Sequence, residues 1–453
     1  MGAQATVPPS PSVTSRSLVA NRIINMQPTN GKIALLHHVG GGNLGDDATL
    51  DTVMQNIKRR RPNAVMAAFT INPDDTKQRH RIPSYPIRTT PWAFGYRRAT
   101  PERTLKRTIK ALARKYRFLF FLPRLGYDLA FRIPKTLYSE VLLLVASRRI
   151  ISSFELLIIS GGGQLTERDG PWSFPYTLFK WVLLAKSARV RCLFLNVGAG
   201  PLSHPWSKFF VRRALAVADY VSFRDDQSRI LVSQIGFKGS CQVFPDCVYS
   251  REVPALNAGA PGKSGQLRVG IAPMPYWGPR VDPSERNHVL YQGFIDKLAT
   301  FAASLARDSH LLTLFGTDIG VDPLAIKDLQ LSLLTHHNVA TPEYKSVSSI
   351  DELLSRISAM DYVVTCRFHG VVFAHLLNKP VLALSHHPKV MTLMNDLGLS
   401  KYCMDIRTFD PALLADTFAS LVADTDEVKH RMAASLAEYR SRLLSQFNEL
   451  FAP

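Results

Sequence analysis

The sequence predicts an α/β protein made of two Rossmann-like domains whose parallel sheets face a cleft. Three observations predict this fold. Short apolar runs typical of buried strands alternate with helix-like segments along the chain. Residues 251–266, REVPALNAGAPGKSGQ, interrupt the alternation with Pro, Gly and Ala, as is typical of a linker. The chain has 453 residues, which is enough for two sizeable domains.

The first predicted domain covers residues 30–250. Each of its apolar runs is followed by a helix-like segment, so the strands are expected to be parallel with right-handed crossovers. These runs lie at 32–39, 64–71, 155–160, 191–197 and 220–223.

The second predicted domain covers residues 267–453 and repeats the same alternation. Ligands in such sheets bind beyond the carboxyl ends of the strands, so functional residues are expected in the strand-to-helix turns. The expected strands lie at 267–273, 311–317, 361–366 and 380–385, and the expected helices at 288–307, 350–360 and 371–378.

The composition and the lengths of the apolar runs indicate the cellular compartment of the protein. Residues 1–29 are rich in Pro, Ser and Thr and lack the apolar core of a signal peptide, so we expect a disordered leader. The apolar runs are much shorter than the roughly 20 residues of a membrane-spanning helix. The five cysteines are scattered, without CxxC pairs or zinc-like spacing. A cytoplasmic protein with reduced thiols and no structural metal is expected.

A basic insertion, residues 97–150, carries much of the net charge of +19. Between Arg97 and Lys135 there are twelve Lys or Arg residues against Glu102 and Asp128. The basic residues recur at helical spacing, which leaves two interpretations: a helix that lies on an anionic membrane surface, or a helix that packs on its own domain with a solvated basic side. No nucleic-acid-binding motif accompanies the charge, so no nucleic-acid partner is expected.

Three glycine-rich turns follow predicted strands of the first domain. They contain Gly41 and Gly42, Gly162 and Gly163, and Gly200, where a missing side chain allows close approach to a ligand. Purely structural tight turns remain the alternative. The first turn lacks the spacing of a P-loop or of a dinucleotide site, and its Asp46 either meets a ligand or caps the next helix.

A fourth turn, in the second domain, places Arg367 and His369 where the strand DYVVTC gives way to a helix. Arginine binds a carboxylate or phosphate with two hydrogen bonds, and a helix N-terminus favours an anion. The helix dipole disfavours imidazolium, so His369 is expected to be neutral and able to accept a proton. Arg224 either faces an anion or pairs with a neighbouring Asp, and Lys389 either joins the anion site or is a solvated helix-start residue.

Seven motifs in order resemble those of the polysaccharide pyruvyl transferase family over roughly residues 31–405. They are GGGNLGDDA, SGGGQL, NVGAGPL, SFRDDQS, the PD of FPDCVYS, CRFHGVVFAHLLNKPVLALS, and HPKV with LMNDLGL. The resemblance implies a GT-B-like fold and transfer of pyruvate from phosphoenolpyruvate to two sugar hydroxyls as a cyclic ketal, with release of phosphate. It implies no cofactor and no metal, phosphoenolpyruvate being a co-substrate.

The resemblance also implies roles for individual residues. Arg367 and His369 match the R-x-H motif and would serve phosphoenolpyruvate, with His369 as general acid or base. Asn43 and Asp46 match the amino-terminal turn, and Asp46 is the expected carboxylate for the acceptor. The acceptor is therefore expected on the domain of residues 30–250 and phosphoenolpyruvate on the domain of residues 267–453. Arg224 matches the S-x-R-D motif and Lys389 the late lysine. The sequence departs from the family pattern at Cys247, often a proline, and at His386, commonly a tyrosine.

The expected acceptor is a sugar of an exopolysaccharide or cell-wall glycan, lipid-linked if the basic insertion docks the enzyme on the inner membrane face. Two other functions share the predicted fold and stay open. One is a GT-B glycosyltransferase that uses a nucleotide sugar, and the other is a non-catalytic protein that binds phosphorylated glycans. The oligomeric state is not predicted.

Overall fold

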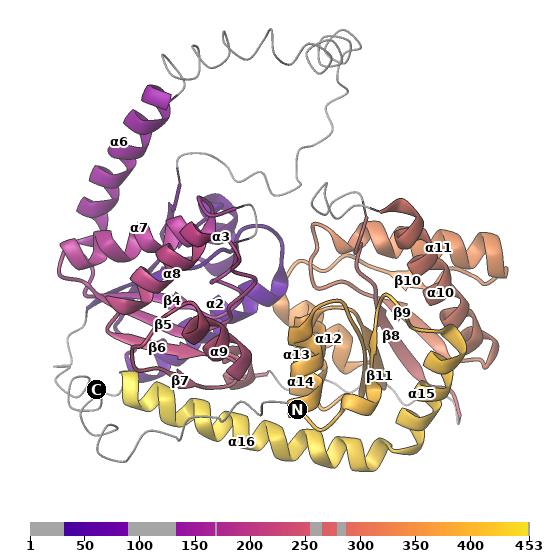
Figure 1. The fold of residues 1–453 in the computed structure, drawn as a ribbon. Coiled ribbons are helices and arrows are strands. Elements are labelled where there is room, and N and C mark those ends of the chain that lie inside the picture. The colour runs from indigo at the N-terminus through magenta and orange to yellow at the C-terminus, as the bar shows by residue number, and fades with distance from the viewer. Residues whose placement is uncertain (1–30, 89–132, 168–169, 254–264, 279–286, 452–453) are drawn as a thin grey trace, which may run out of the picture.

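The computed structural model describes residues 31–88, 133–167, 170–253, 265–278 and 287–451 (Figure 1). The predicted leader and most of the basic insertion lie outside the described residues. In the described part, no helix is both long and apolar enough to cross a membrane.

The first domain is built on a parallel seven-stranded sheet with the strand order β3-β2-β1-β4-β5-β6-β7. The order reverses between β1 and β4, which is the Rossmann switch point where ligands bind. The strands are β1 (Lys32–Leu36), β2 (Val65–Thr70), β3 (Ser84–Pro86), β4 (Leu156–Ser160), β5 (Arg191–Val197), β6 (Tyr220–Phe223) and β7 (Gln242–Val243).

Helices cover both faces of this sheet, because each buried strand presents apolar side chains alternately to either side. Ile33 and Leu35 of β1 pack with the core that includes Val53. Ala34 and Leu36 pack with the opposite core. The helices of this domain are α2 (Leu44–Arg60), α3 (Pro73–His80), α6 (Ile133–Ile151), α7 (Phe174–Ser187), α8 (Pro205–Ala216) and α9 (Asp226–Gln234), followed by the 3₁₀ turn η2 (Cys247–Ser250).

The second domain repeats this plan with a parallel six-stranded sheet in the order β10-β9-β8-β11-β12-β13. Its switch point lies between β8 and β11. The strands are β8 (Arg268–Ala272), β9 (Leu311–Leu314), β10 (Glu343–Tyr344), β11 (Tyr362–Thr365), β12 (Val381–Ser385) and β13 (Cys403–Asp405). The helices are α10 (His288–Arg307), α11 (Asp322–His337), α12 (Ile350–Ser358), α13 (Phe368–Leu376), α14 (Pro388–Asp396), the 3₁₀ turn η3 (Ser400–Tyr402), α15 (Pro411–Ala423) and α16 (Thr425–Phe451).

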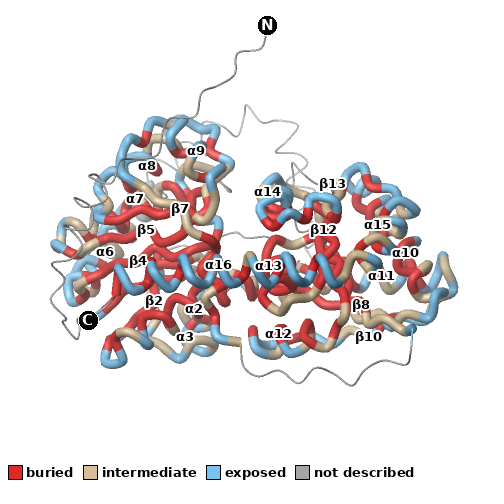
Figure 2. The backbone as a smooth tube through the Cα atoms, turned by 90° about the horizontal axis from the view of Figure 1, so that it is seen from below, coloured by how far each residue is buried: buried red, intermediate tan, exposed pale blue. Residues whose placement is uncertain are grey.

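The last helix, α16, runs under both domains (Figures 1 and 2). Its first half packs on α13, where Nε2 of the buried His375 lies 2.8 Å from the carbonyl oxygen of Met432. Its second half reaches the first domain, where the buried Gln446 donates to the side chains of Asn196 and Ser222. The chain segment predicted as the second domain therefore ends on the first one.

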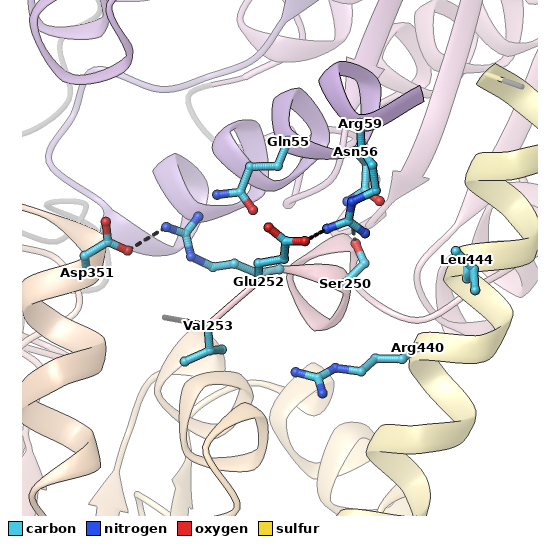
Figure 3. A pocket seen from close by; sticks show the side chains of 10 residues that line it. Gln55, Asn56, Arg59, Ser250, Glu252, Val253, Asp351, Arg440 and Leu444 are labelled. Carbon is cyan, nitrogen blue, oxygen red and sulfur yellow. Dashed lines mark hydrogen bonds and ion pairs between the residues drawn. The ribbon is translucent and has the colours of Figure 1, made fainter. Parts of the chain in front are cut away.

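A buried arginine also joins the domains. Arg251, at the start of the predicted linker, donates to Asp51 of α2 and, over 2.8 Å, to Asp351 of α12. Beside it lies a cavity of about 870 Å³ (Figure 3). The cavity is lined by Gln55, Asn56, Arg59, Ser250, Arg251, Glu252, Val253, Asp351, Arg440 and Leu444.

Candidate active site

The two domains meet where the turn before α2 faces the loop after β9. Leu44 N–H donates to the Thr317 carbonyl over 2.8 Å, and Ile319 N–H donates to the Gly42 carbonyl over 2.9 Å. Gly42 has φ +86°, and a Cβ atom there would lie 3.2 Å from Cγ1 of Ile319. A Cβ atom on Gly41 would meet nothing within 4 Å. Gly42 thus serves the contact between the domains, whereas Gly41 borders open space.

Helix α2 begins at this contact, and its first turn touches the second domain. The Asn43 side chain caps the helix by accepting from Gly45 N–H over 3.0 Å. Gly45 packs directly under the His369 ring, because a Cβ atom on Gly45 would lie 2.0 Å from Nδ1 of that imidazole. The N-terminus of α2 therefore meets the N-terminus of α13 at His369.

Asp46 lies at the same helix start and borders the turn after β4. A Cβ atom on Gly162 would lie 3.0 Å from Oδ1 of Asp46, and Gly162 itself has φ +62°. Burial, reinforced by Asp47, raises the pKa of Asp46 to about 7, although Lys389 and Arg224 oppose the shift. A carboxyl group with such a pKa can either give or take a proton near neutral pH.

His37 and Gln164 complete this part of the site, and the sequence did not single out either. A Cβ atom added to Gly162 would also lie 3.3 Å from Gln164 Nε2 and 3.6 Å from His37 Nε2. Both His37 ring nitrogens are buried without a hydrogen-bond partner among the described residues. Burial, together with the nearby His80 and His369, lowers the pKa of His37 to about 3, so its ring is neutral. Such unsatisfied polar groups mark a place where a ligand is expected to bind.

His369 lies between the domains with its ring almost fully buried. Its Nε2 is 3.9 Å from Oδ2 of Asp246 and has no hydrogen-bond partner in the described part of the chain. Burial lowers the pKa of His369 well below its usual value, and the positive charges of Arg224, Lys389 and Arg367 add to this effect. The ring is therefore neutral, and burial is the largest cause.

Arg224 and Lys389 come from different domains and share one aromatic ring. The Arg224 guanidinium carbon lies 4.3 Å from the centre of the Phe368 ring, and Lys389 Nζ lies 5.9 Å from it. Arg224 Nη1 is also 3.5 Å from Oδ2 of Asp246. The ring face attracts both cations and holds them beside His369. The sequence suggested that Arg224 either faces an anion or pairs with an Asp. The structure shows that Arg224 pairs with a carboxylate and also lies beside His369.

Arg367 precedes α13, and one edge of its guanidinium is already occupied. Its Nε donates to Oδ1 of the fully buried Asp322 over 3.0 Å, and its Nη2 donates to the same oxygen. Burial disfavours the charge, but Asp322 and Asp318 outweigh it and raise the pKa of Arg367. A ligand would therefore meet the other edge of the guanidinium group.

The remaining predicted residues are the glycines Gly163 and Gly200. Gly163 is exposed, and a Cβ atom there would meet nothing within 4 Å. Gly200 has φ +103° and packs against Leu231, since a Cβ atom would lie 2.9 Å from Leu231 Cδ2. Among the described residues, no group of three or more His, Cys, Asp or Glu side chains is placed to hold a metal ion.

Several solved structures share the fold at low sequence identity. A putative UDP-N-acetylglucosamine 2-epimerase from Listeria monocytogenes has a TM-score of 0.56 and 12% identity, with 93% of this chain and 96% of that chain covered. MnaA of S. aureus, solved with UDP, has a TM-score of 0.52 and 10% identity, with 93% of each chain covered. UDP-GlcNAc 2-epimerase from Methanocaldococcus jannaschii has a TM-score of 0.51 and 7% identity, with 86% and 92% covered.

These similarities confirm the predicted architecture: two parallel-sheet α/β domains in a GT-B-like arrangement. A search of curated proteins found no match to this chain. The model of one family, described as polysaccharide pyruvyl transferase, matches residues 43–388. This span contains the turn at Asp46, the Arg224 motif and the Arg367–His369 pair, and it exceeds half of the chain. The chain therefore belongs to the polysaccharide pyruvyl transferase family.

Proposed function

We propose that the protein transfers pyruvate from phosphoenolpyruvate to two hydroxyls of a glycan sugar, forming a cyclic ketal and releasing phosphate. The observation that carries this proposal is that a neutral histidine and a carboxyl group with a pKa of about 7 meet at the interface between the domains. His369 packs on Gly45, the residue that precedes Asp46. Proton transfer at both ends of the reaction needs such a pair.

The cations of the site suit the donor. Phosphoenolpyruvate carries a carboxylate and a phosphate, and Arg224, Arg367 and Lys389 surround the start of α13. The guanidinium group of arginine binds a planar carboxylate or a tetrahedral phosphate with two hydrogen bonds, and a helix N-terminus adds N–H donors. The donor is proposed to lie on the second-domain side, over Phe368, and to involve no cofactor.

The chemistry can then be written in two steps. A sugar hydroxyl adds to C2 of phosphoenolpyruvate while C3 takes a proton and becomes a methyl group. The second hydroxyl then bonds to C2 as the C2–O bond to phosphate breaks, and its proton leaves with the phosphate. We assign Asp46 to the acceptor hydroxyl, as the base that removes its proton. We assign His369 to the donor side, where the negative charge of the bound donor favours the protonated imidazole that gives C3 its proton. Each such group contributes on the order of 100-fold or more in rate.

The donor is tested by measuring heat stability with added ligand. A bound ligand stabilises the folded state, so phosphoenolpyruvate is expected to raise the Tm. If a UDP-sugar raises the Tm and phosphoenolpyruvate does not, the protein is a nucleotide-sugar enzyme instead. Release of phosphate from phosphoenolpyruvate with candidate sugars, and a ketal detected by mass, separate an enzyme from a phosphoglycan-binding protein.

The acceptor is proposed to be lipid-linked, with the enzyme bound peripherally to the inner membrane face. The basic charges of residues 97–135 support this proposal, because anionic lipids attract such a segment. Helix α6, which follows that segment, exposes Tyr138, Val141, Leu142 and Val145 at helical spacing. Deletion of 97–135 is expected to abolish sedimentation with anionic liposomes, and unchanged sedimentation would refute the proposal.

A further inference from the structure

Two tryptophans stand side by side on the surface of the first domain. Trp172 and Trp206 precede α7 and open α8, and their side chains are about half exposed, at 56% and 51%. Their ring centres are 6.2 Å apart, and the ring planes differ by 33°. Large exposed aromatic rings leave apolar area in water, and where they gather they mark a binding surface.

The pair is held in place from below and from the side. The buried Phe210 contacts both rings, with centre distances of 5.3 Å to Trp172 and 5.9 Å to Trp206. The Glu167 carboxylate accepts the N–H groups of Ser203 and His204 over 2.8 and 2.9 Å, and so ties the loop after β4 to the loop after β5. The rings are therefore fixed before any ligand arrives, which reduces the entropy cost of binding.

This surface adjoins the candidate active site. Both tryptophans follow strand ends of the first domain, at the edge of the sheet where ligands bind. The Trp172 carbonyl accepts from Arg88, just beyond β3, over 3.0 Å. Phe174 contacts the ring of His38 with centres 3.6 Å apart, and His38 follows His37 of the site. The tryptophan pair thus continues the acceptor side of the site outward.

We propose that Trp172 and Trp206 form a platform on which a pyranose ring of the acceptor glycan stacks. A pyranose presents a face of C–H groups, and the face of an aromatic ring carries partial negative charge that attracts them. The exposed Ser203 and His204 directly precede α8. The Ser203 hydroxyl donates to Glu167 and His204 Nδ1 accepts from Trp206 N–H over 3.2 Å, so His204 Nε2 is the group proposed to bond a sugar hydroxyl. This inference rests on the proposed function, and it identifies the acceptor as an oligosaccharide that extends beyond the pyruvylated sugar.

Exposed tryptophans could also bind a lipid surface instead of a glycan. The glycan is favoured because the platform follows the strand ends at the site and is flanked by polar groups of the 201–206 loop. Direct binding separates the two. The whole chain, without phosphoenolpyruvate, is titrated by calorimetry with pyranose tetrasaccharides of glucose, galactose, mannose or N-acetylglucosamine. In parallel it is sedimented with vesicles of phosphatidylcholine and phosphatidylglycerol.

At least one tetrasaccharide is expected to bind, and Trp172→Ala or Trp206→Ala to weaken it on the order of tenfold. The double Trp→Phe variant keeps two aromatic faces and is expected to retain most of the affinity, which separates stacking from misfolding. Leu331→Ala, which removes an exposed apolar side chain on α11 of the second domain, is the control and is expected to bind saccharide and vesicles as the parent does.

The proposal is overturned if no tetrasaccharide binds, if the alanine variants bind equally well, or if they lose only vesicle binding. The Tm with phosphoenolpyruvate is measured on the same samples. Stabilisation by phosphoenolpyruvate without tryptophan-dependent saccharide binding would leave the proposed donor intact and remove the platform. Tryptophan-dependent saccharide binding without stabilisation by phosphoenolpyruvate would keep the platform and remove the proposed donor.

Discussion

The His369 imidazole packs on the Cα atom of Gly45, so one domain's proposed proton-transfer residue is positioned by the other domain's helix start. A Cβ atom at Gly45 would lie 2.0 Å from the ring nitrogen Nδ1, closer than atoms can approach. Gly45→Ala is therefore expected to displace His369 and lower kcat at least roughly tenfold, because a shift of about 1 Å at a reacting group is costly.

Steady-state rates of ketal formation check this. Gly293→Ala, on α10 with no atom within 4 Å of the added Cβ, is the control and should keep the parent rate. Parent-like kcat in Gly45→Ala would show that the His369 position is not critical.

Asp46 should make both rate and stability depend on pH. Its pKa, raised to about 7 by burial, means that the deprotonated base form accumulates only as the pH passes about 7, so the rate should rise through that range. The folded state also holds this proton more tightly than the unfolded chain. Stability is therefore lost between about pH 4 and pH 7 as the pH rises.

Asp46→Asn removes both effects. It is expected to lower kcat on the order of 100-fold or more and to raise the Tm relative to the parent above pH 7 but not at pH 4. Thermal melts at both pH values and a pH–rate profile check this. Asp416→Asn changes an exposed carboxylate on α15 and is expected to leave the rate unchanged. An equal Tm gain at both pH values would contradict the assignment.

The Phe368 ring should tune donor binding through the two cations that it holds. Phe368→Leu keeps an apolar side chain but removes the ring face beneath Arg224 and Lys389. Such contacts are worth about 0.5–2 kcal/mol, so KM for phosphoenolpyruvate is expected to rise roughly twofold to thirtyfold. Phe409→Leu removes a comparable contact with Lys297, 5.6 Å from the ring centre, and should leave that KM unchanged.

Arg367 pairs with Asp322 and is proposed to bind the donor as well, and lysine cannot replace it in both roles. Nε and Nη2 both bind Asp322, which leaves the other edge of the guanidinium for the donor. Lysine has a single nitrogen and cannot reproduce this planar fork. Arg367→Lys is expected to raise KM for phosphoenolpyruvate more than about tenfold and to lower the Tm, because Asp322 is buried.

The matched control is Arg268→Lys, which alters a similar fork to Asp361 outside the site. It should lower the Tm without changing KM for the donor. A donor KM that stays at the parent value in Arg367→Lys would exclude Arg367 from donor binding.

The sheets could be predicted from sequence because buried parallel strands appear as apolar runs with helices between them. The strands at 191–197 and 220–223 begin and end at the predicted residues. The edge strands β3, β10 and β13 have two or three residues each, too few to show a pattern. The first strand was predicted to continue to residue 39, but it ends at Leu36.

That early end explains why His37 was not recognised as a site residue: it lies in a strand-to-helix turn, not within the strand. Arg367 and His369 could be located because two chemically informative residues follow one strand. The Phe368 contacts, the Asp322 partner and the Gly45–His369 contact join segments far apart in the chain, and no local pattern encodes such contacts. The sequence left open whether Arg224 faces an anion or pairs with an Asp. Only the structure could show that Arg224 pairs with a carboxylate and also lies beside His369.

Helix α16 has a consequence for exchanging parts between related enzymes. Its Gln446 is buried among Asn196, Tyr220 and Ser222, so the end of the chain contributes to the core of the opposite half. A chimera joined at residues 254–264 would bring a foreign C-terminal helix onto this polar pocket. Functional recombination of the two domains is therefore expected to require the native second half of α16 alongside the native first domain.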